Sequence, residues 1–141
     1  MTLTALIVDD SRMIRMLAAQ ILEDEGFETL EAPDGSQGLD MLRKRPDVII
    51  SDLNMPRMNG VTFVKAVRAD LRSTDTPLVM ISGDNDDGKR SLAMEAGVDA
   101  WLAKPFGPKE LLTAVGEAML LRSGPWRRRN AARVVDAAAN W

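Results

Sequence analysis

Polar and charged side chains stand where the short apolar runs of this chain end, and this pattern constrains the fold more than any other feature. The pairs of run and polar residue are 5–8 with Asp9 and Asp10, 48–51 with Asp52, 78–81 with Ser82, and 100–103 with Lys104 and Pro105. In an open sheet of parallel strands, sites form in the crevice beyond the carboxyl ends of the strands. The pattern therefore predicts that three carboxylates, a hydroxyl and an ammonium gather at one edge of such a sheet.

Strand-like and helix-like segments alternate along residues 4–121. Short apolar and β-branched runs predict five strands, at residues 4–8, 28–32, 48–51, 78–82 and 100–103. Periodic segments, several of them closed by glycine or proline, predict five helices, at residues 11–25, 35–45, 60–71, 88–96 and 108–121. The chain therefore reads as five units, each a strand followed by a helix.

The composition of the strands indicates how the sheet is built. The first, third and fourth runs are almost wholly apolar, which is typical of parallel strands covered by helices on both faces. Short loops and right-handed crossovers then favour an α/β fold. We predict a doubly wound five-stranded parallel sheet with the flavodoxin-like strand order 2-1-3-4-5, plus a C-terminal extension.

The composition excludes several classes of chemistry. The 141 residues include no Cys and no His, which rules out disulfides, Cys/His zinc sites, catalytic triads and phosphohistidine on this chain. Any metal must therefore bind through oxygen. The N-terminal residues lack the features of a secretory leader, and no apolar run approaches about 18 residues, so we expect a cytoplasmic protein without a membrane span.

Charge is distributed unevenly between two parts of the chain. Residues 122–141 hold five arginines and one aspartate, a net charge of +4, whereas residues 1–121 carry a net charge of −7. The sequence Ser123-Gly124-Pro125 interrupts the last predicted helix of the α/β part. We therefore expect an α/β domain at 1–121 and an arginine-rich C-terminal extension at 122–141, with separate roles.

Asp9, Asp10 and Asp52 form the first candidate site. Three carboxylates in a small volume repel one another, which raises the pKa of at least one of them. A divalent cation relieves this repulsion, and ligation by oxygen alone selects Mg²⁺ or Mn²⁺ over zinc. A carboxylate in this position can act as a nucleophile on phosphorus, because phosphoryl transfer needs mainly positioning and charge neutralisation.

Four signatures in this order resemble the receiver domain of bacterial two-component response regulators, especially the single-domain CheY-like type of chemotaxis. They are Asp9-Asp10, the stretch 52–60, Ser82-Gly83 and Lys104-Pro105-Phe106. The spacing agrees with the family, because Ser82 lies 30 residues and Lys104 lies 52 residues beyond Asp52. The resemblance covers residues 4–121. It implies a signalling protein rather than a metabolic enzyme, with a histidine kinase or a phosphotransfer protein as partner.

The resemblance also implies roles for single residues. Asp52 is the phosphoacceptor, Lys104 neutralises the phosphoryl oxygens, and Ser82 donates a hydrogen bond to one of them. The Mg²⁺ site then consists of Asp9, Asp10, Asp52 and the backbone carbonyl of Asn54.

Trp101 stands three positions before the lysine, where the family has a switch aromatic that is more often Tyr or Phe. A tryptophan at this position is also explained as a core residue, and the sequence leaves both interpretations open. The Lys104–Pro105 peptide bond is expected to be cis by the same resemblance, which agrees with the low cis penalty of proline.

The basic extension has three interpretations. The simplest is a solvated end, and the second is non-specific attraction to nucleic acid or an anionic membrane. The third, a nucleotide site, is favoured because every basic residue is Arg, whose guanidinium reads guanine and binds phosphate. Trp126 and Trp141 add stacking surfaces. Arg133 and Asp136 share one face if the segment is helical.

The motif Arg-x-x-Asp resembles the inhibitory cyclic di-GMP site of diguanylate cyclases. The whole architecture resembles CheY-like cyclic di-GMP effectors, which implies cyclic di-GMP as ligand and a flagellar motor component as partner. The candidate nucleotide-binding residues are Trp126, Arg127, Arg128, Arg129, Arg133, Asp136 and Trp141. We expect this extension to be mobile alone and to order around its ligand. The alternative is a phosphorylation-driven single-domain regulator whose tail only contacts protein partners.

Overall fold

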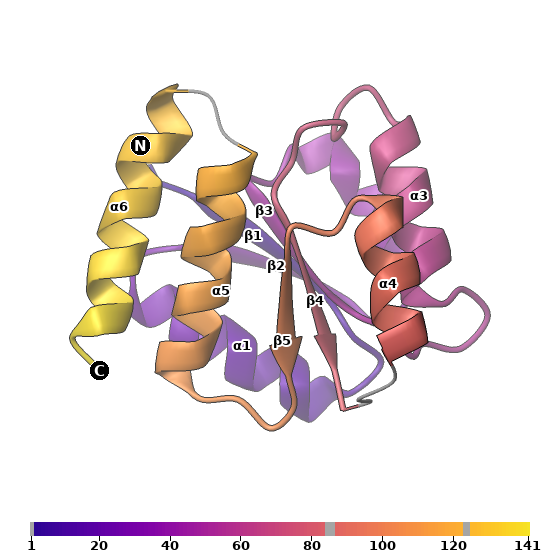
Figure 1. Cartoon of the computed structure of the whole chain (residues 1–141), viewed down its shortest axis with the longest axis horizontal. Helices are drawn as coiled ribbons and strands as arrows, with labels where there is room; N and C mark the ends of the chain where they lie inside the picture. The colour runs from indigo at the N-terminus through magenta and orange to yellow at the C-terminus, as the bar shows by residue number, and fades with distance from the viewer. Residues whose placement is uncertain (1, 84–86, 123–124) are drawn as a thin grey trace.

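A parallel sheet stands between two layers of helices (Figure 1). The computed structural model describes residues 2–83, 87–122 and 125–141, and the side chains of residues 125–128 lie outside this description. The strands are β1 (Thr4–Val8), β2 (Glu28–Ala32), β3 (Val48–Asp52), β4 (Leu78–Ser82) and β5 (Ala100–Ala103). The helices are α1 (Arg12–Asp24), α2 (Gly35–Asp40), the 3₁₀ helix η1 (Met41–Lys44), α3 (Gly60–Ala69), α4 (Asp87–Ala96), α5 (Pro108–Leu121) and α6 (Pro125–Ala139).

The strand order confirms the predicted topology. The sheet runs β2-β1-β3-β4-β5, and each neighbouring pair is parallel. In the register of the central strands, Val8 lies beside Ser51, and Asp52 lies beside Ile81. The carboxyl ends of β1, β3 and β4 are therefore level, and the polar residues that end them meet at one rim.

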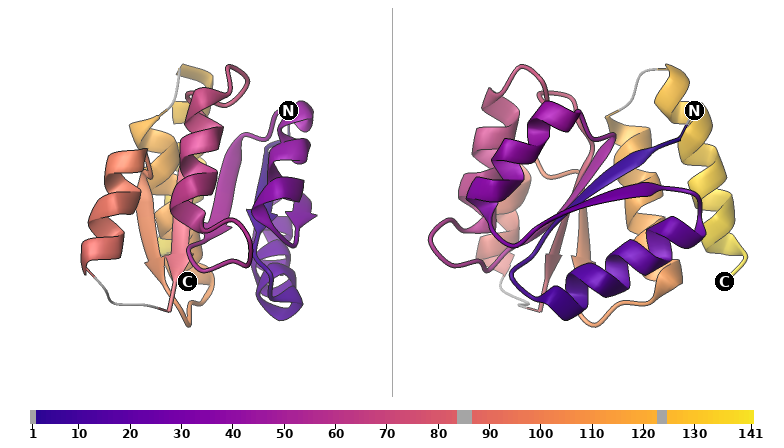
Figure 2. Two further views of the ribbon diagram at one scale, coloured as in Figure 1. Left: turned by 90° about the vertical axis from the view of Figure 1, so that its right-hand side faces the viewer. Right: turned by 180° about the vertical axis from the view of Figure 1, so that it is seen from behind.

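Two hydrophobic cores fill the space between the sheet and its helices. One core joins side chains of α1, α5 and α6 to one face of the sheet, and the other joins α3 and α4 to the opposite face. Figure 2 shows the same arrangement from the side and from behind. β1, β3 and β4 are buried on both faces, as their apolar composition predicts.

Local sequence determines where several helices begin and end. The Ser11 hydroxyl accepts a hydrogen bond from the backbone N–H of Ile14 and so caps α1. The predicted helix at 35–45 differs from the structure, because α2 ends at Asp40 and continues as η1 only to Lys44. Two glycines weaken this helix, and one of them, Gly38, is required because a Cβ there would lie 2.9 Å from the Phe63 ring.

The C-terminal extension is an ordered helix that packs against α5. Ala131, Val134 and Ala138 are buried and belong to the core beneath α1 and α5. The two helices approach closely at Gly116 of α5, where a Cβ would lie 2.6 Å from Cγ2 of Val135. The structure therefore differs from the expectation of a tail that orders only around a ligand. Small apolar side chains on one face of α6 let it bury that face against α5.

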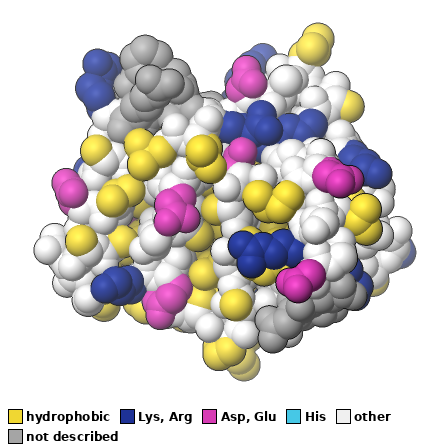
Figure 3. Space-filling view, viewed as in Figure 1, with side chains coloured by type: hydrophobic (Ala, Val, Ile, Leu, Met, Phe, Trp, Pro, Cys, Tyr) yellow, Lys and Arg dark blue, Asp and Glu magenta, His cyan; other side chains and the backbone are white. Residues whose placement is uncertain are grey.

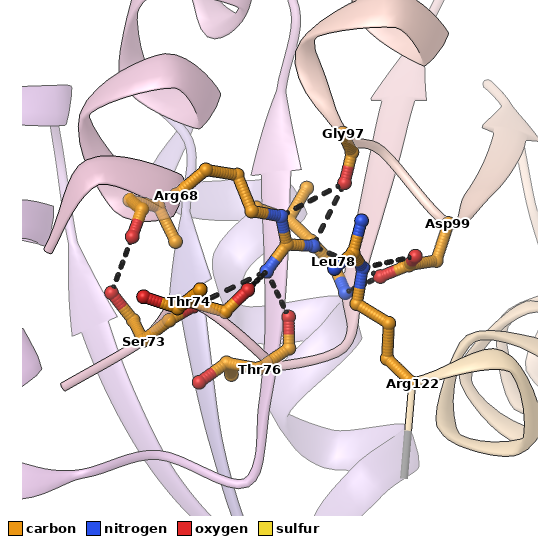
Figure 4. A network of polar contacts seen from close by, with 9 residues as sticks. Arg68, Ser73, Thr74, Thr76, Leu78, Gly97, Asp99 and Arg122 are labelled. Carbon is orange, nitrogen blue, oxygen red and sulfur yellow. Dashed lines mark hydrogen bonds and ion pairs between the residues drawn. The ribbon is translucent and has the colours of Figure 1, made fainter. Parts of the chain in front are cut away.

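An aspartate-centred network holds the amino-terminal end of β4 and β5 (Figure 4). Asp99 Oδ2 accepts hydrogen bonds from Arg68 Nη2 at 3.0 Å and from the backbone N–H of Leu78 at 2.9 Å. Asp99 Oδ1 accepts one from Arg122 Nε at 2.6 Å. Arg68 also donates to the carbonyl of Gly97. Because Arg122 follows the last residue of α5, the network anchors the chain just before α6.

Among the described residues, no helical segment combines the length and the apolar character that a bilayer span requires.

Candidate functional site

Three carboxylates meet at the rim where β1 and β3 end. Asp52 is the last residue of β3, and Asp9 and Asp10 follow β1 directly. One carboxylate oxygen from each of the three residues lies within 4.8 Å of the other two. Asp9 and Asp52 are buried, whereas Asp10 is exposed. The cluster predicted from the sequence is therefore assembled, with its two buried members beneath an exposed one.

Lys104 reaches this cluster from the end of β5. Its Nζ lies 3.2 Å from Asp9 Oδ2 and 3.2 Å from Asp52 Oδ1. The ammonium side chain is about a quarter exposed, at 23%, so it can approach a ligand as well as the two carboxylates. The peptide bond between Lys104 and Pro105 is cis, which confirms the expectation from the sequence.

The ionisation of Asp52 and Lys104 reflects their crowding. Burial raises the pKa of Asp52 above its ordinary value, and the neighbouring charge of Asp9 adds to this rise, while Lys104 opposes it. Burial lowers the pKa of Lys104, but the carboxylates of Asp52 and Asp9 outweigh that effect and raise it overall. The sequence-based expectation of at least one raised carboxyl pKa is thus confirmed at Asp52. The site holds more negative charge than one ammonium balances.

A divalent cation fits this donor set. Asp9 Oδ2 is buried and accepts no hydrogen bond from the described residues, although Lys104 Nζ forms an ion pair with it. Asp9 Oδ1 accepts a hydrogen bond from the backbone N–H of Ser11 at 2.8 Å. All the candidate ligands are oxygens, and exposed Asp10 leaves the cluster open to solvent, as suits a cation that keeps several waters. The residues present therefore match Mg²⁺.

The loop between β3 and α3 turns sharply beside the cluster. Gly60 permits this turn, because a Cβ at that position would lie 2.6 Å from the carbonyl oxygen of Asp52. Asn59 caps α3 by accepting a hydrogen bond from the N–H of Thr62 at 2.9 Å. These contacts hold α3 against the end of β3, so that Asn54 follows Asp52 at the same rim.

Ser82 and Trp101 complete the residues expected near Asp52. Ser82 is buried at the end of β4, and its carbonyl accepts the N–H of Lys104 at 2.9 Å. Trp101 of β5 is half-buried and packs against the core beneath α3 and α4. The guanidinium carbon of Arg90 lies 5.7 Å from the centroid of its ring, a cation–π distance. Trp101 is therefore neither fully buried nor free in solvent.

A second candidate site lies where α6 passes the end of α1. A hollow of about 500 Å³ is lined by Glu25, Arg133, Asp136, Ala137, Asn140 and Trp141. Arg133, Asp136 and Trp141 of the predicted nucleotide site are thus brought together, with the arginine and the aspartate on one helical face. Arg129 is exposed one turn earlier, while the side chains of Trp126, Arg127 and Arg128 lie outside the described residues.

Two contributors to these sites have no signal in the sequence. Glu25 reads only as the end of a helix, and nothing near it in the chain links it to Arg133. The position of Arg90 over Trp101 is equally hidden, because it joins α4 to β5 across the fold. The sequence around Arg90, in the first turn of α4, does not indicate that its side chain lies over Trp101. Such long-range pairs become visible only in the folded chain.

The residues of this rim lie in a segment that is similar to known proteins. A sequence profile of the response regulator receiver domain matches residues 5–116. The structure of the chemotaxis response regulator CheY4 of Vibrio cholerae superposes with a TM-score of 0.79 at 39% identity, covering 84% of this chain and 99% of that one. A response regulator of Chloroflexus aurantiacus gives a TM-score of 0.79 at 32% identity, covering 84% and 98% of the two chains.

Curated relatives share the same segment. The transcriptional regulatory protein CpxR of Escherichia coli is 38% identical over 118 residues, which are 84% of this chain and 49% of that protein. The DNA-binding response regulator MtrA of Mycolicibacterium smegmatis is 39% identical over 111 residues, which are 78% of this chain and 47% of that protein. The chain spans about half the length of these two relatives.

Proposed function

The chain belongs to the response regulator receiver family, and we propose that it carries its signal as a phosphoryl group on Asp52. Receiver domains are signalling modules, and membership implies a histidine kinase or a phosphotransfer protein as partner. The observation that supports Asp52 as the acceptor is its geometry: its Oδ1 lies 3.2 Å from Lys104 Nζ, inside a cluster of three carboxylates. This arrangement provides a nucleophile and the positive charge that a phosphoryl group needs.

In the proposed reaction, a carboxylate oxygen of Asp52 attacks the phosphorus of the donor. The new O–P bond forms as the P–N bond of a phosphohistidine, or the P–O bond of a small acyl phosphate, breaks. Lys104 holds its ammonium beside the incoming phosphoryl oxygens, and Ser82 donates its hydroxyl proton in a hydrogen bond to one of them. Mg²⁺ held by Asp9, Asp10, Asp52 and the carbonyl of Asn54 would supply further positive charge there.

The raised pKa of Asp52 makes cation binding part of this proposal. Burial and the Asp9 charge favour the protonated carboxyl, which is a poor nucleophile. A cation held by the same oxygens favours the ionised form. Asp9 Oδ2, which accepts no hydrogen bond from the described residues and pairs only with the Lys104 ammonium among them, would bind the same ion.

Phosphorylation by a small acyl phosphate tests this proposal. Wild-type protein incubated with acetyl phosphate and Mg²⁺ should gain a base-labile, hydroxylamine-sensitive acyl phosphate, detected as an increase in intact mass by one phosphoryl group. Asp52→Asn should abolish the increase, and chelation of Mg²⁺ should do the same. Asp40→Asn is the matched control, because Asp40 is an exposed aspartate away from the rim. A wild-type chain that stays unlabelled, or a labelled Asp52→Asn variant, would contradict the proposal.

We further propose that α6 binds cyclic di-GMP and that this input controls contact with a flagellar motor component. The hollow beside α6 supports the first part, because it holds a guanidinium, two carboxylates, an amide and an indole within a volume suited to a small ligand. The similarity to a chemotaxis regulator supports the second part. Swimming of cells that lack this protein should differ from that of the parent strain, and unaltered swimming would count against a motor partner.

Calorimetry tests the nucleotide proposal directly. Arg133→Ala and Asp136→Ala should each weaken cyclic di-GMP binding more than about tenfold, because each removes a charged hydrogen-bonding group from the hollow. Arg43→Ala is a suitable control, since Arg43 is an exposed arginine of η1 that does not line the hollow. Absence of binding to the wild type, or unchanged affinity in both variants, would remove the proposal.

The alternative remains a phosphorylation-driven regulator whose tail contacts only protein. The exposed apolar side chains over α5 and α6 favour this candidate (Figure 3). Leu120, Leu121 and Val135 are 47%, 69% and 37% exposed, and such a patch is typical of a docking surface. Under this alternative, cyclic di-GMP does not bind, while Leu121→Ser reduces the effect of the phosphorylated protein on its target.

A further inference from the structure

The hollow beside α6 is formed by two elements that are far apart in the sequence. Its wall on one side is α6, through Arg133, Asp136 and the residues that follow them. Its wall on the other side is Glu25, the C-cap residue that follows α1. Arg133 reaches across, because its Nη1 lies 3.9 Å from where a Cβ of Gly26 would stand. Figure 2 shows α1 and α6 on the same side of the sheet.

The charged groups of this hollow do not satisfy one another. Glu25, Arg133 and Asp136 line the same space, yet within the described part of the chain no hydrogen bond or ion pair engages any of their charged groups. Glu25 uses only its backbone N–H, which donates to the carbonyls of Glu23 and Leu22. Two carboxylates and a guanidinium therefore face a common space with their hydrogen-bonding capacity unused.

This set of groups matches the base of a guanine nucleotide better than its phosphates. A phosphate would be repelled by two carboxylates, whereas the N1–H and N2–H₂ groups of guanine are donors that a carboxylate accepts. A guanidinium can bind O6 and N7 of the same base, and the Trp141 indole, 60% exposed, offers a stacking face. We propose that Glu25 is a base-recognising residue of this site, so that the ligand bridges α1 and α6.

The proposal rests on the nucleotide site proposed above and adds two consequences to it. First, the receiver domain itself contributes to binding, so the ligand fastens α6 to the body of the domain. Second, the site discriminates against adenine, because N1 of adenine is an acceptor and would face the carboxylate of Glu25 without a proton between them. A site rejects the wrong base when that base leaves polar groups of the site without hydrogen-bond partners.

Glu25→Ala in the full chain, compared with Glu28→Ala, tests the proposal. Glu28 is an exposed glutamate three residues further along that does not line the hollow. Calorimetry with cyclic di-GMP and cyclic di-AMP should show that Glu25→Ala weakens cyclic di-GMP binding about tenfold or more. It should also reduce the ratio of the affinity for cyclic di-GMP to that for cyclic di-AMP, which a loss of helix stability alone would not do. Glu28→Ala should leave both affinities unchanged.

Hydrogen exchange on the wild type provides a measurement that needs no variant. Cyclic di-GMP should slow exchange of the backbone amides at residues 24–27 as well as those of α6, because the ligand contacts both walls. Protection confined to α6, or a Glu25→Ala variant that keeps wild-type affinity while Arg133→Ala loses it, would overturn the role of Glu25 and leave the nucleotide site standing. Absence of binding to the wild type would overturn both proposals.

Discussion

The close contact between α5 and α6 predicts that Gly116→Ala destabilises the wild-type protein but stabilises a Val135→Ala variant. A Cβ at position 116 would lie 2.6 Å from Cγ2 of Val135, and 3.4 Å from its backbone nitrogen. Heavy atoms do not approach to 2.6 Å without a shift, and a β-branched side chain in a helix has little freedom to rotate away. The added methyl group must therefore displace α6 or strain the contact.

Two effects of similar size compete in this substitution. Replacing a glycine inside a helix by alanine stabilises the helix by about 1 kcal/mol. Overpacking a close contact costs about 1–3 kcal/mol. Because the contact involves one methyl group against a side chain of a neighbouring helix, we expect an overpacking cost of about 2 kcal/mol. Gly116→Ala should then lower the free energy of unfolding by about 1 kcal/mol.

The variant Val135→Ala removes the obstructing methyl group and should reverse the sign. In that background the Cβ at position 116 has room, so Gly116→Ala should raise the free energy of unfolding by up to about 1 kcal/mol. Urea denaturation of the four proteins in this cycle gives a coupling energy of about 2 kcal/mol between the two positions. A stabilising Gly116→Ala in the wild-type background, or a coupling energy near zero, would refute the packing of α6 on α5.

Three further results are expected. Asp99→Ala should lower the free energy of unfolding by about 3 kcal/mol or more in urea titrations, because it leaves two guanidinium groups without their buried carboxylate. Without divalent cations, Asp52→Asn should be more stable than the wild type at neutral pH and lose that advantage as the pH falls toward 3.8. The reason is that burial and Asp9 raise the pKa of Asp52, so that the folded wild type binds a proton more tightly than the unfolded chain; a difference that stays constant with pH would contradict it. Mg²⁺ at a hundredfold excess over its dissociation constant should raise the free energy of unfolding by about 2.7 kcal/mol, and a chain carrying Asp9→Asn that shows the same rise would refute Asp9 as a ligand.

The fold and the gathering of Asp9, Asp10, Asp52 and Lys104 at one rim were predictable because their signals are local. Apolar runs of four or five residues predict buried parallel strands, and the strand order follows from short right-handed connections. The polar residue that ends each run needs only this topology to reach the common rim. Asp9, Asp10, Asp52 and Lys104 therefore meet as the sequence indicates.

The packing of α6 was not predictable from the same signals. Its sequence is rich in Ala and Arg, and isolated helices of this length are marginal. α6 is stabilised because its small buried side chains pack against α5, where Gly116 has no side chain and lets the two helices approach closely. The position of Glu25 opposite Arg133 in the hollow was unpredictable for the same reason, because nothing in the sequence near either residue indicates the other.

The two aspartate sites at opposite ends of the sheet have contrasting electrostatic roles. At the amino-terminal end, the single carboxylate of Asp99 lies between two guanidinium groups, so its negative charge is more than balanced from within the protein. At the carboxyl end, three carboxylates share the one ammonium of Lys104. At the first end the carboxylate is balanced by charges of the protein itself, so this network is a structural contact that needs no bound ion. At the second end, the carboxylates among the described residues outnumber the ammonium that pairs with them, so a cation bound from solution would change the net charge there.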